Sequence, residues 1–216
     1  GVDVSGLRAP AGDGSTRKLG LGSSAAIVVA TLAARGDFDV STSAGRRAVF
    51  DAALRSHKHV QPDGSGVAIA ASSFGGVLVC RVRGADPSFD PIALAAPVAV
   101  FAARTPASTK EMVSRVRAFA AASPGEHRRI IGAAGDAAER AARSTSEAEL
   151  LAALRDQDAA LRELGAKAAV PIFTPEFDAL ADAARGEGAF FGPSGAGGGD
   201  IGIRVGSAPL GPAFAT

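Results

Sequence analysis

The 216-residue chain contains no tryptophan, no tyrosine and only one methionine, Met112. Its 11 phenylalanines must therefore supply nearly all the large aromatic side chains of any core. Because residue 1 is glycine, we expect the chain to be processed, truncated or lacking segments. No secretory signal is recognisable before the first predicted domain.

Cysteine is equally scarce. Cys80, the single cysteine, lies in the apolar run of residues 77–80 and has no partner for a disulfide within the chain. A cysteine in such a run is typical of a buried, unreactive thiol rather than a nucleophile. The composition therefore suits a reducing, cytoplasmic compartment.

Neither sign of charge dominates, and no long apolar run occurs. The 23 basic and 22 acidic residues give a net charge of +1, which argues against a nucleic-acid partner. No apolar stretch is long enough to span a bilayer, so we expect no membrane partner. With 47% hydrophobic and 21% charged residues, the chain has the balance of a globular protein with one large or two small domains.

Hydrophobic periodicity and turn residues predict a mixed order of helices and strands. Without regular strand–helix–strand alternation, this order indicates an α+β fold with two layers rather than a doubly wound sheet. We interpret residues 84–91 as a linker and divide the chain into domains 1–88 and 89–216. Residues 1–17 and 206–216 are predicted to be irregular. Helices are predicted over residues 25–34, 41–56, 67–73, 108–122, 124–143, 147–164 and 175–185, and strands over 77–82, 97–103, 189–191 and 200–205.

The strongest local motif is Gly-Leu-Gly-Ser-Ser-Ala-Ala at residues 20–26, which opens the first predicted helix. We expect Ser23 or Ser24 to cap this helix, which is predicted to be buried because it is apolar all round. Glycines let the backbone curl, and the unpaired amides and helix dipole then favour a phosphate. The two hydroxyls are also candidates for Mg²⁺. The alternative is a plain glycine turn with an ordinary serine cap.

A second motif, Pro-Ser-Gly-Ala-Gly-Gly-Gly-Asp at residues 193–200, lies between two predicted strands. So many glycines are costly to order, and a tight hairpin would not need them. A loop whose backbone lies directly against a ligand would need these glycines. The alternative is a flexible loop.

Two weaker motifs lie between these. Residues 61–66 form a Gly-Ser-Gly loop that leads to Phe-Gly-Gly at residues 74–76. Residues 106–110, Pro-Ala-Ser-Thr-Lys, place hydroxyls and Lys110 at the start of a helix, where a second anion can bind. Taken singly, these segments also fit an ordinary turn and an ordinary capped helix.

In this order the four motifs resemble the GHMP kinases, and within them most of all the phosphomevalonate kinase branch. The resemblance covers roughly residues 18–205. It implies a domain like the second domain of ribosomal protein S5, followed by a ferredoxin-like domain, in a truncated chain. It also implies phosphoryl transfer from ATP, with Mg²⁺, to a small phosphorylated acceptor such as 5-phosphomevalonate. Such an enzyme would act in isoprenoid synthesis, and we expect a monomer or homodimer. A mevalonate kinase or a sugar kinase is the alternative within the superfamily.

The resemblance also assigns residues by their matching motifs. The ATP-phosphate loop corresponds to Gly20, Leu21, Gly22, Ser23, Ser24 and Ala25, with Ser23 and Ser24 as the Mg²⁺ candidates. The loop that closes over the reacting groups corresponds to Ser194, Gly195, Ala196 and Gly197. Substrate-binding positions correspond to Ser65, Gly66, Ser108, Thr109 and Lys110.

Three departures from the pattern bear on activity. Ala68 occupies the position of an expected catalytic Asp, with Asp63 nearby in sequence, and Gly192 replaces an expected Lys. No counterpart of the family's first motif precedes residue 18. An inactive relative that still binds nucleotide or metabolite is therefore the alternative to an active kinase. His57 and His59 lack a third ligand at a useful spacing, so we do not predict a metal site there.

Overall fold

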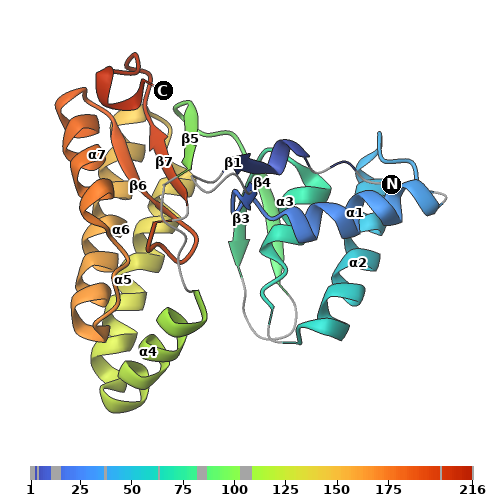
Figure 1. Ribbon diagram of the computed structural model, residues 1–216, viewed down its shortest axis with the longest axis horizontal. Coiled ribbons are helices and arrows are strands. Elements are labelled where there is room, and N and C mark those ends of the chain that lie inside the picture. Colours follow the sequence, from blue (N-terminus) through green and yellow to red (C-terminus); the bar gives the residue numbers. More distant parts are fainter. Residues whose placement is uncertain are drawn as a thin grey trace. The chain divides into compact units, whose positions relative to one another are not determined.

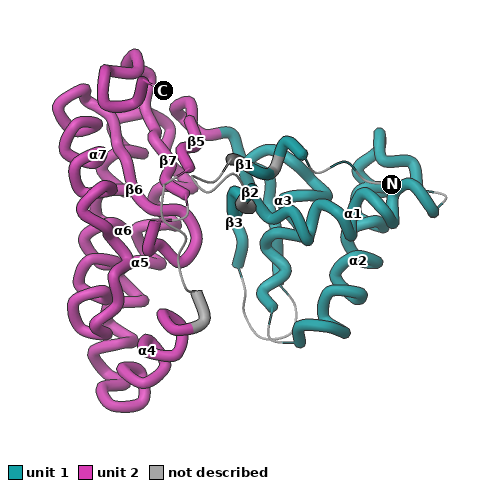
Figure 2. The backbone as a smooth tube through the Cα atoms, viewed as in Figure 1, with its two compact units in different colours: residues 1–93 teal, residues 94–216 magenta. Residues whose placement is uncertain are grey.

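The computed structural model describes residues 3, 5–10, 16–36, 38–62, 64–81, 87–102, 109–199 and 201–215. Its contacts divide the chain into two compact units, residues 1–93 and 94–216 (Figure 2). Both units combine helices with antiparallel strands, so the predicted α+β class is confirmed. The division falls later than the predicted boundary after residue 88 because residues 88–92 pair with the strand before them.

Unit 1 contains three helices and two strand pairs within the described residues (Figure 1). Its strands β1 and β2 form one antiparallel pair, and β3 and β4 form another. Its elements are η1 (Ser5–Leu7), β1 (Arg8–Pro10), β2 (Thr16–Lys18), α1 (Ser23–Arg35), α2 (Ser43–Val60), α3 (Val67–Phe74), β3 (Val77–Arg81) and β4 (Ser88–Ile92).

The core of unit 1 forms where α1, α2 and α3 pack together. Phe50 of α2 is 2% exposed, and its ring lies 5.1 Å from that of Phe74 and 5.2 Å from that of Phe89. Aromatic rings at this spacing add favourable edge and tilted contacts to the burial of their area. Phenylalanine thus supplies the aromatic packing, as the absence of tryptophan and tyrosine predicts.

Several local predictions for unit 1 are wrong. The predicted linker contains β4, whose Phe89 reaches the core and whose Pro91 is tolerated in a strand that pairs on one side within the described chain. The predicted N-terminal loop contains β1 and β2, where Arg8 donates a hydrogen bond to the hydroxyl of Thr16 over 2.8 Å. Helix α1 is not fully buried: only Ala25 and Val29 are, because α2 and α3 cover one side of it.

Two further predictions for unit 1 concern α2 and Cys80. Helix α2 continues beyond the predicted residue 56 to Val60, since no helix breaker precedes Pro62. Its cap is Thr42, whose hydroxyl accepts a hydrogen bond from the Gly45 amide. Cys80 lies on β3 and is half-buried rather than buried as predicted, and this partial burial raises the pKa of its thiol.

Unit 2 places helices against a three-stranded antiparallel sheet in the order β5-β7-β6. Helices α5 and α6 pack against each other, and both α6 and α7 contact β6 (Figure 1). Its elements are β5 (Val98–Ala102), α4 (Thr109–Ala122), α5 (Pro124–Arg143), α6 (Glu147–Ala168), α7 (Pro175–Gly186), β6 (Phe190–Ser194), β7 (Ile201–Val205) and η2 (Pro212–Phe214).

The elements of unit 2 follow the predictions closely. Helix α5 begins and ends at the predicted residues 124 and 143, whereas α6 extends past residue 164 to Ala168. Strand β6 continues past residue 191 to Ser194, because Pro193 is tolerated in a strand at the edge of the sheet. None of the described helices combines the length and the apolar character that a membrane span requires.

The core of unit 2 allows a matched test of packing on helix α5. Ile130 is 1% exposed and belongs to a core cluster, whereas its neighbour Ile131 is 43% exposed. We expect Ile130→Ala to lower the free energy of unfolding by about 2–5 kcal/mol, because it leaves a cavity. Ile131→Ala should cost about 0.5 kcal/mol or less. Urea denaturation followed by circular dichroism measures both, and equal losses would contradict the packing of α5.

Candidate functional site

The loop before α1 is shaped by two glycines with left-handed backbone, Gly20 at φ 73° and Gly22 at φ 75°. Gly22 is the N-cap of α1, and no side chain caps this helix end. The prediction that Ser23 or Ser24 caps the helix is therefore wrong: both serines lie inside the helix. A left-handed cap is costly for residues other than glycine. The cap leaves the first amides of α1 available to an anion.

An open cavity of about 440 Å³ lies at this helix start. It brings together six of the sequence-predicted positions, five from the loop and α1 and one, Ala68, from α3. A Cβ atom placed on Gly22 would lie 3.6 Å from the Cβ of Ala68, so the two backbones approach closely. The predicted positions that line the cavity are Gly20, Gly22, Ser23, Ser24, Ala25 and Ala68.

The cavity also contains residues of α2 and its C-cap that the sequence analysis did not assign to a site. Ser56, His57, Val60 and Gln61 line it, together with Val28 of α1. The helix was predicted to end at residue 56, whereas its continuation to Val60 places residues 56 and 60, and 57 and 61, on neighbouring turns. A four-residue spacing of polar residues in a longer predicted helix would have been the signal.

The two histidines of this helix end lie differently with respect to the cavity. Residues two apart on a helix point in different directions, and only His57 lines the cavity. The described part of the chain contains no group of three His, Cys, Asp or Glu residues that could hold a metal ion. His57 instead lies against Gly64, where an added Cβ atom would come within 2.4 Å of Nε2.

The remaining predicted residues of unit 1 lie outside the lining. Leu21 is 45% exposed. Gly66 is the left-handed N-cap of α3, and its φ of 77° favours glycine there. The Ser65 hydroxyl accepts a hydrogen bond of 3.4 Å from the Val67 amide. Asp63 lies outside the described residues.

Unit 2 carries the second glycine motif at the end of β6. Ser194, Gly195 and Ala196 are exposed, and the turn continues through left-handed Gly197 and Gly198. The Gly198 amide donates a hydrogen bond of 2.9 Å to the carbonyl of Ile172. A Cβ atom on Gly197 would lie only 2.4 Å from that same oxygen, so the close approach requires glycine.

The other predicted positions of unit 2 are near the start of α4 and on β6. Ser108 lies outside the described residues, and Thr109 and Lys110 form the first turn of α4. Gly192 is buried, and a Cβ atom there would come within 2.6 Å of the Phe190 ring. The cavity of unit 1 and the glycine motif of unit 2 are predicted to hold one ligand together, and this stays a prediction.

Comparison with known proteins identifies relatives of the chain. No family model matches it. The phosphomevalonate kinase of Streptomyces sp. (strain CL190) is 34% identical, over 88% of this chain and 57% of the relative. The chain therefore spans a little more than half the length of this curated relative.

Solved structures show the same fold. The Lin0012 protein from Listeria innocua has a TM-score of 0.77 and 26% identity, over 91% of this chain and 62% of its own. Streptococcus pneumoniae phosphomevalonate kinase, solved with phosphomevalonate and AMPPNP, has a TM-score of 0.71 and 18% identity, over 88% and 62%. L. major mevalonate kinase, solved with R-mevalonate, has a TM-score of 0.68 and 21% identity, over 87% and 57%.

These matches confirm the resemblance that the four motifs predict. The sequence similarity extends over most of the chain, and the fold is shared with mevalonate and phosphomevalonate kinases. The chain has the GHMP kinase fold and, in sequence, is similar to phosphomevalonate kinase.

Proposed function

We propose that this chain takes part in ATP-dependent phosphoryl transfer to a small phosphorylated acceptor of the 5-phosphomevalonate type. The observation that carries the proposal is the start of α1, where left-handed Gly22 leaves the helix without a side-chain cap beside a cavity of about 440 Å³. Open amides and a helix dipole at a cavity of this kind favour a phosphate group. The similarity to phosphomevalonate kinase supports the same reaction.

In this proposal the loop of residues 20–25 holds the β- and γ-phosphates of ATP. Ser23 and Ser24 supply hydroxyl oxygens in the cavity, which fit an ion that prefers oxygen ligands and keeps several waters. Mg²⁺, when bound there, would neutralise charge on the phosphates. The amides of residues 194–197 would donate to the transferring group, and residues 108–110 would hold the acceptor.

Ala68 bears on which acceptors can react. No Asp or Glu of the described chain lines the cavity, and the position next to Gly22 that was expected to carry a carboxylate is a methyl group. A hydroxyl acceptor must lose its proton during transfer, which a general base assists. A phosphate acceptor needs no such help, because its second pKa is about 6 and its oxygens are mostly ionised at neutral pH.

The reaction is then a direct displacement. An ionised oxygen of the acceptor's phosphate forms a bond to the γ-phosphorus, and the bond from that phosphorus to the bridging oxygen of ADP breaks. Positioning and charge stabilisation account for most of the catalysis in such transfers. The residues of this chain that bind and orient the phosphates therefore matter more than a proton acceptor would.

A second candidate function is binding without turnover. The methyl group at Ala68 and the glycine at position 192 favour it, since the pattern of the resemblance places a carboxylate and a cation at these positions. Titration calorimetry with Mg-ATP distinguishes the candidates when it is combined with turnover assays. We place either function in the cytoplasm and in isoprenoid synthesis, with the chain as a monomer or homodimer.

The acceptor preference tests the proposed function. We expect turnover with 5-phosphomevalonate and a kcat/KM for mevalonate, galactose or homoserine that is lower by about 10²-fold or more, the usual contribution of a general base. A coupled assay for ADP measures all four acceptors. Binding of Mg-ATP without turnover of any acceptor would favour the second candidate, and no binding would contradict both.

An Ala68→Asp variant distinguishes a chain that acts on phosphate acceptors without a carboxylate from a chain that is catalytically impaired. We expect Ala68→Asp to raise turnover of hydroxyl acceptors by about 10²-fold, because the carboxylate can accept their proton, and to change turnover of 5-phosphomevalonate little. Ala68→Asn, similar in size but not basic, is the matched control. A large gain with 5-phosphomevalonate would instead show that the natural chain is catalytically impaired.

The left-handed cap of α1 gives a test of nucleotide binding. Gly22 and Gly188 share a φ of 75°, and an added Cβ atom meets no close contact at either position. We expect Gly22→Ala and Gly188→Ala each to cost about 1–2 kcal/mol of stability through backbone strain. Only Gly22→Ala should also weaken Mg-ATP binding, by about tenfold if one amide–phosphate hydrogen bond is lost. Calorimetry measures this, and equal affinities in the two variants would exclude α1 from the nucleotide site.

A further inference from the structure

The glycine motif of unit 2 rests on a short segment of residues 169–173 between α6 and α7, which we term the platform. Its Val170 and Ile172 are 5% and 7% exposed. The Ile172 carbonyl accepts the hydrogen bond from the Gly198 amide and lies against the backbone of Gly197. The conformation of the glycine motif therefore depends on where the platform holds this carbonyl.

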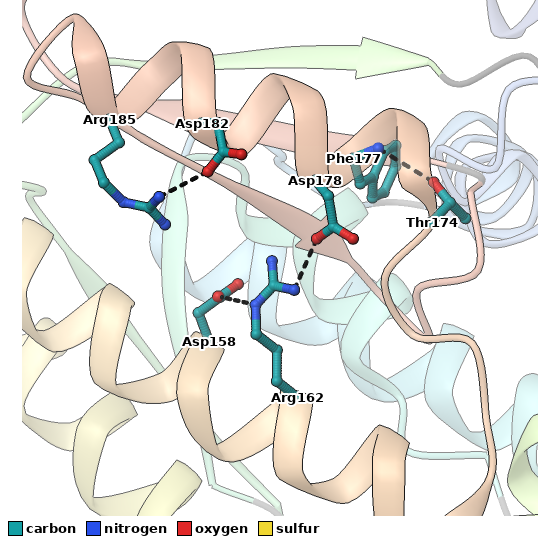
Figure 3. A network of polar contacts seen from close by, with 7 residues as sticks. All are labelled: Asp158, Arg162, Thr174, Phe177, Asp178, Asp182 and Arg185. Carbon is teal, nitrogen blue, oxygen red and sulfur yellow. Dashed lines mark hydrogen bonds and ion pairs between the residues drawn. The ribbon is translucent and has the colours of Figure 1, made fainter.

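Arg162 of α6 contacts one side of the platform through Phe173, and Figure 3 shows its ion pairs with Asp158 and Asp178. Its guanidinium lies 3.9 Å from the centre of the Phe173 ring. Its Nη1 donates to Asp178 Oδ1 of α7 over 2.7 Å, and its Nε donates to Asp158 Oδ2 of α6 over 2.8 Å. One planar group thus joins α6, the residue next to Ile172 and the first turn of α7.

The other side of the platform is held from α4. Arg115 donates a hydrogen bond of 2.8 Å to the carbonyl of Ala169. Gly165 of α6 approaches so closely that an added Cβ atom would lie 3.0 Å from the carbonyl oxygen of Val170. Since α4 begins at Thr109, the platform connects the helix proposed to hold the acceptor with the glycine motif.

The buried carboxylate of Asp158 is compensated by the charge of Arg162 beside it. The Asp158 side chain is 14% exposed, and its Oδ1 is buried without a hydrogen-bond partner among the described residues. Arg162 supplies the neighbouring positive charge, and it also contacts Phe173 and Asp178. A planar guanidinium can stack on a ring while it donates to two carboxylates, and an ammonium group cannot.

We propose that Arg162 is a positioning residue that sets the conformation of residues 195–198 through the platform. It touches no proposed substrate atom and acts through Phe173, Ile172 and Gly198. Only the catalytic consequence of this role rests on the proposed function. The effect on the glycine motif can be measured in the free protein.

The test replaces both charges, because removing Arg162 alone would leave a buried carboxylate uncompensated. The variant is Asp158→Asn with Arg162→Gln. The matched control is Arg140→Gln with Asp156→Asn, which neutralises an exposed ion pair of 2.6 Å between α5 and the same helix α6. Hydrogen–deuterium exchange of the peptide covering residues 192–199 and the melting temperature are measured for both variants.

We expect the Gly198 amide to exchange about tenfold faster in the Asp158/Arg162 variant, as its hydrogen bond to Ile172 loosens. The control should exchange like the natural chain. Unchanged exchange at Gly198 in a folded Asp158/Arg162 variant would overturn the proposal. If that variant does not fold, Arg162→Lys decides: it keeps a charge beside Asp158, and natural exchange rates in it would also overturn the proposal.

Kinetics test the catalytic consequence. In a chain that turns over 5-phosphomevalonate, we expect the Asp158/Arg162 variant to lose about 10–10²-fold in kcat, the scale expected when charge-stabilising donors are misplaced. Its KM for the acceptor should change less than about twofold if ground-state binding is preserved. A loosened glycine motif with unchanged kcat would contradict the catalytic role. An inactive natural chain would contradict the proposed function and leave the exchange result standing.

Discussion

The backbone amides at the start of α1 are the feature on which this account depends. Helices α2, α6 and α7 begin with Thr42, Ser146 and Thr174, whose hydroxyls accept hydrogen bonds from amides of the first turn. Helix α1 begins with a left-handed glycine and no side-chain cap, beside a cavity large enough for a small ligand. Helix α3 also begins with a left-handed glycine, Gly66, and no side-chain cap, so the adjoining cavity is what distinguishes the start of α1 as a candidate anion site.

The second glycine motif is governed by close approach rather than by flexibility. Gly197 and Gly198 lie against the Ile172 carbonyl, where a side chain at position 197 could not fit. The platform that supplies this carbonyl is held by arginines from α4 and α6. Glycine in the loop and arginine beneath it are thus two parts of one arrangement, which exposes the residues from Ser194 to Ala196 while fixing those that follow.

Much of the architecture could be predicted from the sequence where local signals agree with the fold. Helix α5 has Pro124 in its first turn and the polar residues 144–146 after it, so both its ends were predicted correctly. The cap of α1 was not, because serine is the commoner cap and only the observed φ of Gly22 shows that the glycine takes this position. Strand β4 was missed because Pro and Asp residues suggested a linker, whereas pairing with β3 and burial of Phe89 determine its structure.

The candidate site shows the same division between local and long-range information. Glycines and serines at positions 20–25 were predicted from their own spacing, and Ala68 only from the resemblance. Ser56, His57 and Gln61 join them in the cavity because α2 runs further than predicted and packs beside α1. Such neighbours depend on tertiary packing, and the four-residue spacing of His57 and Gln61 is their local signal.

The central proposal is that the loops of residues 20–25 and 194–197 bind one triphosphate through their amides. Hydrogen–deuterium exchange of the natural chain, titrated with Mg-ATP, tests it directly without any substitution. The account predicts that peptides covering residues 20–25 and 194–197 become protected together, with the same dependence on ATP concentration. Protection of one peptide without the other, or of neither, would contradict it.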